Sequence, residues 1–331
     1  MKRIAVIGAG SWGTALAIIL DRLEHQVRLW VRRPELAATI RRQRENTEYL
    51  PSCPIPESVF VSSEPEAVLH EAEIVLSVMP SHTVRAVFTV MKPYLKRDMV
   101  FVSATKGIEN DSLMRMTQVI GDVLGSPPPA LAVLSGPAFA LEVVSGDPTA
   151  IVLASEDDAT SHMLQRELYG RNLRTYTNRD VIGVEIGGAV KNVIAIAAGV
   201  VRGLGFGSNT LAGLITRGLT EITRLVTALG GKAETMAGLA GLGDLVLTCT
   251  AQLSRNRSVG VQLGQGKALS EIVGPMRMVA EGVRTTKSTL NLAGRAGVEM
   301  PITEQMYSIL FEGKSPSLAL RSLMERELKG E

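Results

Sequence analysis

Residues 3–13 of this 331-residue chain read RIAVIGAGSWG, and this stretch decides the fold of the first half. It begins with a short β-branched run, Arg3 to Ile7, which predicts a strand and leads at once into a glycine-rich loop. The helical sequence TALAIILDRL and a second predicted strand, Val27 to Trp30, come next. A strand, a G-x-G-x-x-G loop, a helix and a strand within about thirty residues predict a dinucleotide-binding unit.

Each glycine of the loop has its own physical role in such a unit. Gly8 permits the tight turn, Gly10 lets a pyrophosphate approach the backbone, and Gly13 lets helix and strand pack closely. The phosphates then lie at the N-terminus of the helix, where free N–H groups and the helix dipole favour anions. The alternative is a glycine-rich turn in another kind of α/β protein, but the intact flanking pattern favours the dinucleotide.

The end of the second strand bears on which coenzyme is bound. Units that prefer NAD usually have an acid here, which binds the adenosine ribose hydroxyls. This chain reads Trp30-Val31-Arg32-Arg33-Pro34, with no acid until Glu35. Two arginines suit a 2′-phosphate, so we expect NADP(H) to bind well, with NAD(H) use still possible. The alternative is an exposed basic pair at the end of a strand.

Strand and helix patterns alternate through the rest of the first half. Further buried parallel strands are predicted at Glu73–Val78, Met99–Ser103, Leu131–Leu134 and Thr149–Ala154. Helices are predicted between them, at Thr83–Leu95, Ser112–Leu124 and Asp157–Tyr169. The alternation predicts an α/β, doubly wound Rossmann-type sheet with helices on both faces, whose ligands bind beyond the carboxyl ends of the strands.

Two loops at those strand ends are candidate site segments. Lys106 follows a predicted strand directly and precedes a glycine, so its side chain can point into the cleft. The loop Ser135–Ala140, with the sequence SGPAFA, follows the next strand. For Lys106, the alternative is an ordinary surface lysine.

The second half shows one helical pattern after another and no alternating strand. The expected helices are Glu185–Val201, Asn209–Leu229, Arg255–Leu263, Glu281–Ala296, Thr303–Phe311 and Ser317–Leu328. We therefore expect two domains: residues 1–180 as an NAD(P)-binding Rossmann domain and residues 181–331 as an all-helical substrate and dimerisation domain.

Within the second half, Val184 to Val201 reads VEIGGAVKNVIAIAAGVV and is apolar on nearly every face. Such a helix should be buried all round, yet Lys191 sits in its middle with Asn192 beside it. A buried lysine must be paired, must extend its ammonium to solvent, or must lose its proton. Perturbed lysines of this kind are often proton donors or acceptors.

Two loops of the helical half also carry chemical groups. The glycine-dense run from Gly238 ends in Asp244, which can take part in a site, cap the helix LVLTCT, or do both. The sequence Ser254-Arg255-Asn256-Arg257 stands where a helix should begin. A serine cap, free N–H groups and arginines form a natural phosphate cradle, although a capped surface helix is as good an interpretation of this stretch alone.

Composition restricts the class of protein. The net charge of +2 gives no electrostatic case for nucleic acid or a membrane surface. The two cysteines, Cys53 and Cys249, form no metal-binding spacing and suit a reducing cytoplasm. No uncharged apolar run approaches the length of a membrane span, and the basic start MKRIAVIGAG breaks too early for a signal peptide.

Several stretches together resemble a known family, in its order and at its spacing. They are GAGSWGTALA, MPSH, ATKGIE, SGPAFA, IGGAVKNVIAIAAG, GLAGLGDLVLTCT and SRNR. Over essentially the whole chain they are similar to the bacterial-type NAD(P)-dependent glycerol-3-phosphate dehydrogenases. The resemblance implies a 6-phosphogluconate dehydrogenase-like fold, with a Rossmann domain followed by an all-α domain.

The resemblance also implies roles for individual residues. Lys191 would be the proton donor or acceptor, with Lys106 and Asp244 as further catalytic residues. Besides the three glycines of the loop, the cofactor would be bound by Ser11, Trp12, Arg32, Arg33, Tyr49, Lys106, Ala140, Arg255, Val279 and Glu281. The substrate would be bound by Lys106, Gly136, Ala138, Lys191, Asp244, Ser254, Arg255 and Asn256. The family often has serine or threonine where this chain has Ala138, so only a backbone contact can remain there.

The implied reaction is reduction of dihydroxyacetone phosphate by NADPH or NADH to sn-glycerol 3-phosphate, which is reversible and supplies glycerophospholipid synthesis. Lys191 would give the proton to the developing alkoxide, and no metal is required. Two alternatives are a related dehydrogenase of a β-hydroxyacid or sugar-acid phosphate, and a non-catalytic NADP-sensing protein. The expected partners are a small-molecule substrate and a second copy of the chain in a homodimer.

Overall fold

The predicted strand–loop–helix–strand unit is present in the computed structural model, which describes residues 1–276 and 278–327. Strand β1 (Arg3–Ile7) is followed by the glycine loop, helix α1 (Ser11–Arg22) and strand β2 (Gln26–Trp30). The two strands pair in parallel from Arg3 opposite Gln26 to Ile7 opposite Trp30. Eight consecutive residues of α1, Gly13 to Leu20, are buried, as its almost wholly apolar sequence requires.

An eight-stranded sheet continues from this unit, in the order β10-β9-β8-β7-β6-β1-β2-β5. The strand order reverses between β1 and β6, so the glycine loop lies at the topological switch point where such sheets bind ligands. The prediction of a doubly wound Rossmann-type sheet is confirmed. The remaining strands are β5 (Phe60–Ser62), β6 (Ile74–Ser77), β7 (Val100–Ser103), β8 (Ala130–Ser135), β9 (Thr149–Ala154) and β10 (Leu173–Asn178).

One predicted strand runs in the other direction. The stretch Thr149–Ala154 forms β9 with the expected bounds, but β9 pairs antiparallel with β8, so the prediction of a parallel strand is wrong at this pair. A strand buried on both faces reads as the same apolar run in either direction, so its composition cannot give its direction. Strand β10, at the sheet edge and parallel to β9, was not predicted.

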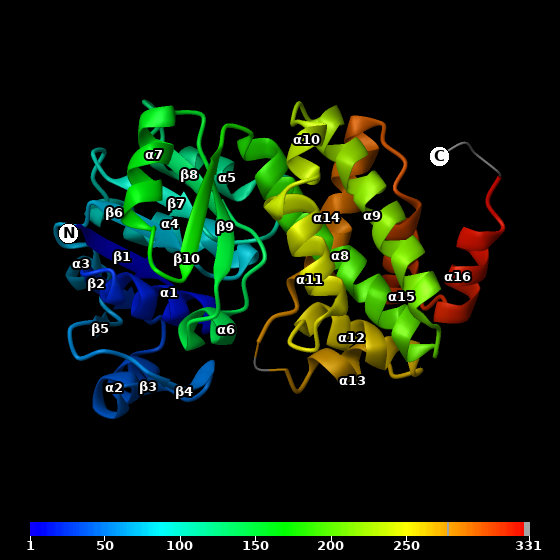
Figure 1. Ribbon diagram of the computed structural model, residues 1–331, viewed down its shortest axis with the longest axis horizontal. Coiled ribbons are helices and arrows are strands. Elements are labelled where there is room, and N and C mark those ends of the chain that lie inside the picture. Colours follow the sequence, from blue (N-terminus) through cyan, green and yellow to red (C-terminus); the bar gives the residue numbers. More distant parts are fainter. Residues whose placement is uncertain (277, 328–331) are drawn as a thin grey trace. The chain divides into compact units, whose positions relative to one another are not determined.

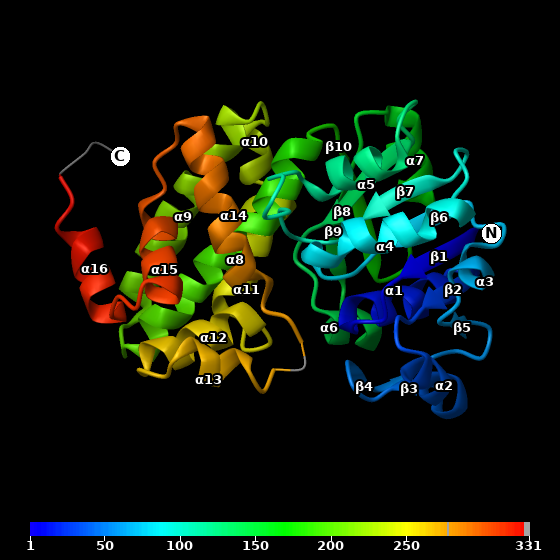
Figure 2. The same cartoon turned by 180° about the vertical axis from the view of Figure 1, so that it is seen from behind.

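Helices cover both faces of the sheet (Figures 1 and 2). Alternate residues of β1 point to opposite faces: Ile4 and Val6 join one core with α1, and Ala5 and Ile7 join another. The first core also includes residues of α6 (Ala140–Ser145) and α7 (Asp158–Glu167); the second includes residues of α3 (Pro65–Leu69), α4 (Val84–Met91) and α5 (Met116–Leu124). Helix α5 begins four residues later than predicted, and single 3-10 turns flank α4 at Ser81–Thr83 and Lys92–Tyr94.

A small hairpin lies outside the large sheet. After α2 (Pro34–Gln43), strands β3 (Glu45–Asn46) and β4 (Leu50–Pro54) pair antiparallel. Asn46 is fully buried, and its amide donates to the carbonyl oxygen of Ala9 at 2.9 Å. The hairpin is thereby attached to the glycine loop.

The described residues of the second half form helices joined by loops and contain no strand, as predicted. Helix α8 (Val181–Gly203) is long and apolar enough to cross a membrane by length and composition, but 94% of its most apolar window is buried inside the protein. It is therefore the core helix that the sequence predicted. The other elements are α9 (Ser208–Ala228), α10 (Ala233–Met236), a π-helical turn (Leu239–Gly243), α11 (Asp244–Thr250), α12 (Arg255–Gly264), α13 (Leu269–Val273), α14 (Glu281–Ala296), α15 (Pro301–Phe311) and α16 (Pro316–Met324).

The chain divides into two compact units. Unit 1 contains residues 1–106 and 114–185, and unit 2 contains residues 107–113 and 186–331. The first residues of α8 are thus counted with the sheet, and the segment 107–113 with the helices. The helix expected at Ser317–Leu328 corresponds to α16, and its expected last residue, Leu328, lies outside the described residues.

Candidate active site

The glycine loop of unit 1 has the geometry of a phosphate cradle. Gly8 has φ +119°, and a Cβ there would lie 2.3 Å from the carbonyl oxygen of Val78. A Cβ on Gly13 would lie 1.8 Å from the carbonyl oxygen of Gly8, whereas nothing lies within 4 Å of a Cβ on Gly10. The loop is therefore tight at its two ends and open at Gly10, beside the uncapped N-terminus of α1. This chain's residues fit a bound pyrophosphate.

At the end of β2, the structure brings together several predicted cofactor residues. Arg33 lies over the ring of Tyr49, 6.0 Å from its centroid, and forms an ion pair with Glu48. The hydroxyl of Ser11 donates to the carbonyl oxygen of Tyr49 at 2.6 Å. Arg32 is exposed. The fold thus gathers residues from α1, the end of β2 and the β3–β4 turn around one place.

The strand-end loops of unit 1 also meet as expected. Lys106 follows β7, and its ammonium donates to the carbonyl oxygen of Gly136 at 3.0 Å. Gly136 has φ +126°, a conformation that favours glycine, and it follows β8 directly. Ala138 and Ala140 are partly buried against the core that α1 and α6 share, as is Trp12. Lys106 therefore has a fixed place at the carboxyl end of the sheet.

In unit 2, Lys191 is only 6% exposed, and Asp244 and Thr248 are among its side-chain partners. Its ammonium donates to the carboxylate of Asp244 at 2.5 Å and to the hydroxyl of Thr248 at 2.5 Å. Thr248 in turn donates to the main-chain carbonyl of Asp244 at 2.7 Å. Of the three possibilities for a buried lysine, the structure therefore has the paired one, and Lys191 does not extend to solvent.

Asp244 and Thr248 show what the sequence could and could not reveal. Asp244 is the first residue of α11 and not its cap, because Gly243 occupies the cap position. Thr248 was not predicted as a site residue. Residues four apart on a helix lie on one face, so the predicted helix LVLTCT already indicated that Thr248 lies beside Asp244. The short distance from α11 to Lys191 on α8 depends on packing, which the local sequence does not encode.

A second polar network lies beside Lys191. The side chain of Asn192 accepts a hydrogen bond from the amide of Asn256 at 3.0 Å, and Asn256 accepts one from the backbone N–H of Gly282 at 2.9 Å. A Cβ on Gly282 would lie 2.5 Å from the carbonyl oxygen of Asn192, so only glycine allows this approach. Asn192 was not predicted as a site residue. The network joins α8 to the N-termini of α12 and α14.

The start of α12 has the predicted serine cap. Ser254 is its cap, and its hydroxyl accepts a hydrogen bond from the N–H of Arg257 at 3.3 Å. Arg255 donates to the carbonyl oxygen of Val279 at 3.3 Å and interacts electrostatically with Glu281, the first residue of α14. The structure thus brings together the three residues of unit 2 that were expected to reach the cofactor.

Glycines bring α8 and α12 into backbone contact. A Cβ on Gly199 would lie 2.1 Å from the carbonyl oxygen of Arg257, and one on Gly260 would lie 1.9 Å from that of Ile196. Gly203 and Gly264 continue the same contact one turn further, each with its Cβ position less than 3 Å from the other helix. The direct contact between the backbones of α8 and α12 therefore determines the distance between Lys191 and the start of α12.

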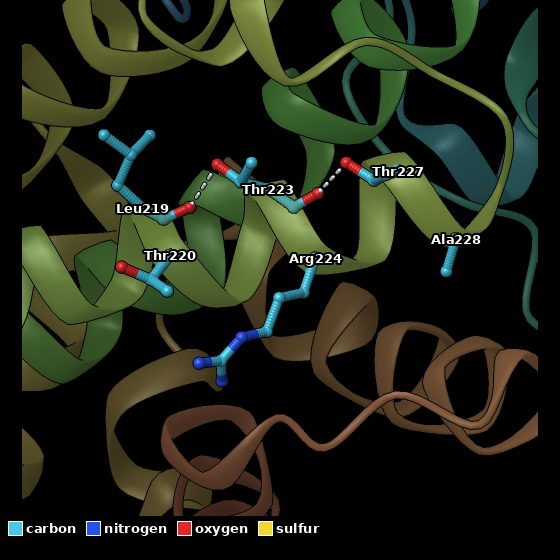
Figure 3. A pocket seen from close by; sticks show the side chains of 6 residues that line it. All are labelled: Leu219, Thr220, Thr223, Arg224, Thr227 and Ala228. Atoms are coloured by element: carbon cyan, nitrogen blue, oxygen red, sulfur yellow. Dashed lines mark hydrogen bonds between the residues drawn. The ribbon is translucent and has the colours of Figure 1, made fainter. Parts of the chain in front are cut away.

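A groove on the surface of α9 is separate from these groups (Figure 3). Thr223 and Thr227 line it, but their hydroxyls donate to carbonyl oxygens four residues earlier in the helix, at 2.8 and 2.9 Å. Arg224 is its one ionisable lining residue. The groove contains none of the predicted site residues; its lining is Leu219, Thr220, Thr223, Arg224, Thr227 and Ala228.

Comparison with known proteins gives one consistent result. Residues 3–161 match the family model of the NAD-dependent glycerol-3-phosphate dehydrogenase N-terminus, and residues 180–321 match that of its C-terminus. Glycerol-3-phosphate dehydrogenase (NAD(P)+) of Koribacter versatilis is 59% identical over 98% of each chain, and that of Citrifermentans bemidjiense is 52% identical over 100% of this chain and 99% of its own. The crystal structure of glycerol-3-phosphate dehydrogenase from Coxiella burnetii superposes with a TM-score of 0.94 at 43% identity, covering 98% of this chain and 99% of that one.

Proposed function

The chain belongs to the NAD-dependent glycerol-3-phosphate dehydrogenase family, and from this premise we propose how its own residues perform the reaction. It is an NAD(P)-dependent oxidoreductase that interconverts dihydroxyacetone phosphate and sn-glycerol 3-phosphate. When bound, the coenzyme supplies or accepts the hydride at C2 of the triose. The protein must bind both molecules, fix their orientation and move one proton.

The proton is assigned to Lys191. Reduction of the carbonyl places negative charge on its oxygen, and a positioned ammonium can neutralise that charge by giving up a proton. Asp244 stabilises the charged lysine, and Thr248 fixes the direction of its N–H bonds, through contacts of 2.5 Å each. In the oxidising direction the neutral amine takes the proton back from the hydroxyl. The paired, buried ammonium is the observation that carries this proposal.

The phosphate of the substrate is assigned to the start of α12. The N–H groups of its first turn, the guanidinium of Arg255 and the amide of Asn256 can all donate to an anion. The network through Asn192 and Gly282 orders Asn256 before the substrate binds. Lys106, Gly136 and Ala138 complete the proposed substrate residues. Binding through the phosphate fixes the carbonyl and so lowers the entropy cost of the reaction.

The coenzyme is assigned to the glycine loop with Ser11 and Trp12, to the arginine pair at the end of β2 with Tyr49, and to Ala140. From the helical half, Arg255, Val279 and Glu281 are proposed to contribute. Arg32 and Arg33 present two guanidinium groups, which suits the 2′-phosphate of NADP(H). NAD(H) remains a coenzyme of this family.

Further proposals concern the whole protein. We assign an NAD(P)-binding Rossmann domain to residues 1–180 and an all-helical substrate and dimerisation domain to residues 181–331, in a cytoplasmic homodimer whose product supplies glycerophospholipid synthesis. Two unpaired, buried cysteines, Cys53 and Cys249, support a reducing compartment. Light scattering after size-exclusion chromatography tests the dimer, since a mass equal to one chain contradicts it.

The activity is tested by following NADPH absorbance with dihydroxyacetone phosphate. We expect oxidation of NADPH that depends on this ketone and formation of sn-glycerol 3-phosphate. Oxidation only with a different ketone would show a related dehydrogenase, and tight NADPH binding with no turnover of any ketone would show a sensor. Either result contradicts the proposal.

A further inference from the structure

Glu48 brings a carboxylate to a place where the local sequence has none. Strand β2 ends at Trp30, and the next acid along the chain is Glu35, within α2. Glu48 belongs to the β3–β4 turn, and its carboxylate forms an ion pair with the guanidinium of Arg33 just after β2. Sheets of this kind usually have an acid at the end of this strand, where it binds the adenosine ribose. The hairpin therefore brings a carboxylate from elsewhere in the chain to Arg33, just after β2.

The turn that carries Glu48 is attached to the coenzyme loop. Asn46, just before the turn, donates to the carbonyl oxygen of Ala9, and Ser11 donates to that of Tyr49, at 2.9 and 2.6 Å. Both contacts connect the hairpin to the glycine loop and the start of α1. The carboxylate of Glu48 consequently has a fixed position relative to the loop.

The side chains of Arg33 and Tyr49 contact the Glu48 carboxylate, and the Glu48 side chain is 24% exposed. Arg33, just after β2, forms an ion pair with the Glu48 carboxylate. The hydroxyl of Tyr49, which lies in the β3–β4 turn with Glu48, hydrogen-bonds to the same carboxylate. Burial, and then this hydrogen bond, raise the pKa of the Tyr49 phenol, so the hydroxyl stays protonated and donates. Arg32, in contrast, forms no hydrogen bond or ion pair with the described part of the chain.

We propose that Glu48 is a specificity-determining residue that reduces the preference of this enzyme for NADPH over NADH. The proposal rests on the assignment of Arg32 and Arg33 to the 2′-phosphate made above. A 2′-phosphate must draw Arg33 away from Glu48 and lie close to a second anion, both of which weaken NADPH binding. The 2′-hydroxyl of NADH brings no charge and can donate a hydrogen bond to the carboxylate.

The test is calorimetric titration of the full-length protein and of Glu48→Gln with NADPH and with NADH. Removal of the charge should lower the Kd for NADPH about tenfold, as expected for two partly solvent-screened anions, and should leave the Kd for NADH unchanged or higher. Titration with 2′,5′-ADP and AMP isolates the adenosine end, and the ratio of their Kd values should change in the same direction.

Two further variants make the result specific. Glu57→Gln removes the same charge from the same unit, but Glu57 is 86% exposed and pairs with Arg44, so both coenzymes should bind as in the parent protein. Glu48→Asp keeps the negative charge but places it one methylene further from Arg33. The ratio of its Kd values for NADPH and NADH should lie between the ratios of the parent protein and of Glu48→Gln. Circular dichroism establishes that each variant is folded, and Glu48→Asp provides the test if Glu48→Gln is not.

The outcomes separate this inference from the function on which it rests. An unchanged ratio of the NADPH and NADH Kd values in folded Glu48→Gln, or an equal loss for both coenzymes, overturns the role of Glu48 and leaves it a structural residue of the turn. If instead the double change Arg32→Ala and Arg33→Ala weakens both coenzymes equally, the assignment of the 2′-phosphate fails, and the inference fails with it.

Discussion

A buried ammonium is stable only beside groups that replace water, and Asp244 and Thr248 are such groups for Lys191. The same contacts restrict its motion, so the proton that we assign to Lys191 would leave from a defined position. A carboxylate that stabilises the charged lysine also makes proton release harder. The substrate oxygen must therefore gain substantial negative charge before it takes the proton, which suits a hydride-transfer reaction.

At the residue scale, we expect Lys191→Ala to lower kcat by about 10²- to 10⁴-fold, the usual contribution of a positioned proton donor. NADPH binding should persist, because the glycine loop and the arginine pair are unchanged. Steady-state kinetics and a calorimetric Kd measure the two effects separately. Turnover near that of the parent protein would contradict the role of Lys191.

A second prediction at this scale concerns coenzyme choice. Replacement of Arg32 and Arg33 together by alanine should weaken NADPH much more than NADH, because only NADPH carries the 2′-phosphate. A loss of about 10-fold to 100-fold in NADPH affinity corresponds to one or two charge-assisted contacts. Fluorescence titration with each coenzyme gives the ratio, and equal losses would make the pair ordinary surface charges.

At the scale of elements, the contact between α8 and α12 positions Lys191 relative to the start of α12, which we propose as the phosphate site. Gly260→Ala places a methyl group 1.9 Å from the carbonyl oxygen of Ile196, so one helix must move. Such overpacking typically costs about 1–3 kcal/mol of stability, and we expect kcat/KM for dihydroxyacetone phosphate to fall as well. Urea unfolding and steady-state kinetics measure the two quantities.

Gly213→Ala is the matched control for this substitution. Gly213 lies within α9, and nothing lies within 4 Å of its Cβ position. There alanine should raise stability by about 0.5–1 kcal/mol through its higher helix propensity and leave the kinetics unchanged. If Gly260→Ala behaved like this control, the close contact of the two helices would be irrelevant to the site.

The joint between α9 and α15 predicts a pH dependence of stability. Glu221 is 3% exposed, and its carboxylate accepts hydrogen bonds from the N–H groups of Ile302 and Thr303 at 2.7 and 3.4 Å. Burial raises its pKa from 4.5 to about 7, despite these hydrogen bonds. The folded state therefore binds a proton between pH 4.5 and about 7 that the unfolded chain releases.

Stability from this group is present in full below pH 4.5 and is lost as the pH rises through about 7. The loss amounts to about 3 kcal/mol, at roughly 1.4 kcal/mol per pKa unit. Glu221→Gln should remove this slope, so the difference in unfolding free energy between the parent and Glu221→Gln should change across the window. Urea denaturation at several pH values measures it, and parallel curves for the two proteins would refute the assignment.

At the scale of the whole molecule, the two units have their own internal contacts and are expected to respond separately to ligands. The compound 2′,5′-ADP should stabilise unit 1, by about 2.7 kcal/mol at a concentration of one hundred times its Kd. Scanning calorimetry should show two unfolding transitions, and 2′,5′-ADP should raise the temperature of one and leave the other unchanged. The transition of unit 2 is identified as the one whose temperature Gly260→Ala lowers. Equal movement of both transitions would contradict separate unfolding.

Much of the fold could be predicted from the sequence, because the patterns involved are local. The strands at β1, β6 and β7 and the buried helix α8 follow from apolar runs and their periods. The direction of β9 and the placement of the β3–β4 hairpin could not be predicted, because they depend on pairing between distant segments. The same limit applies to the site: the local sequence picks out Lys191, but the ion pair of Arg33 with Glu48 exists only in the folded chain.

The apolar character of α8 has a consequence during biosynthesis. While the chain is still being made, this segment of 23 residues has the length and composition that the membrane-insertion machinery recognises. Lys191 lies near its middle, where a lysine disfavours insertion by about 2.5–3.5 kcal/mol. The proposed proton donor is thus also a residue that makes this segment a poorer candidate for membrane insertion.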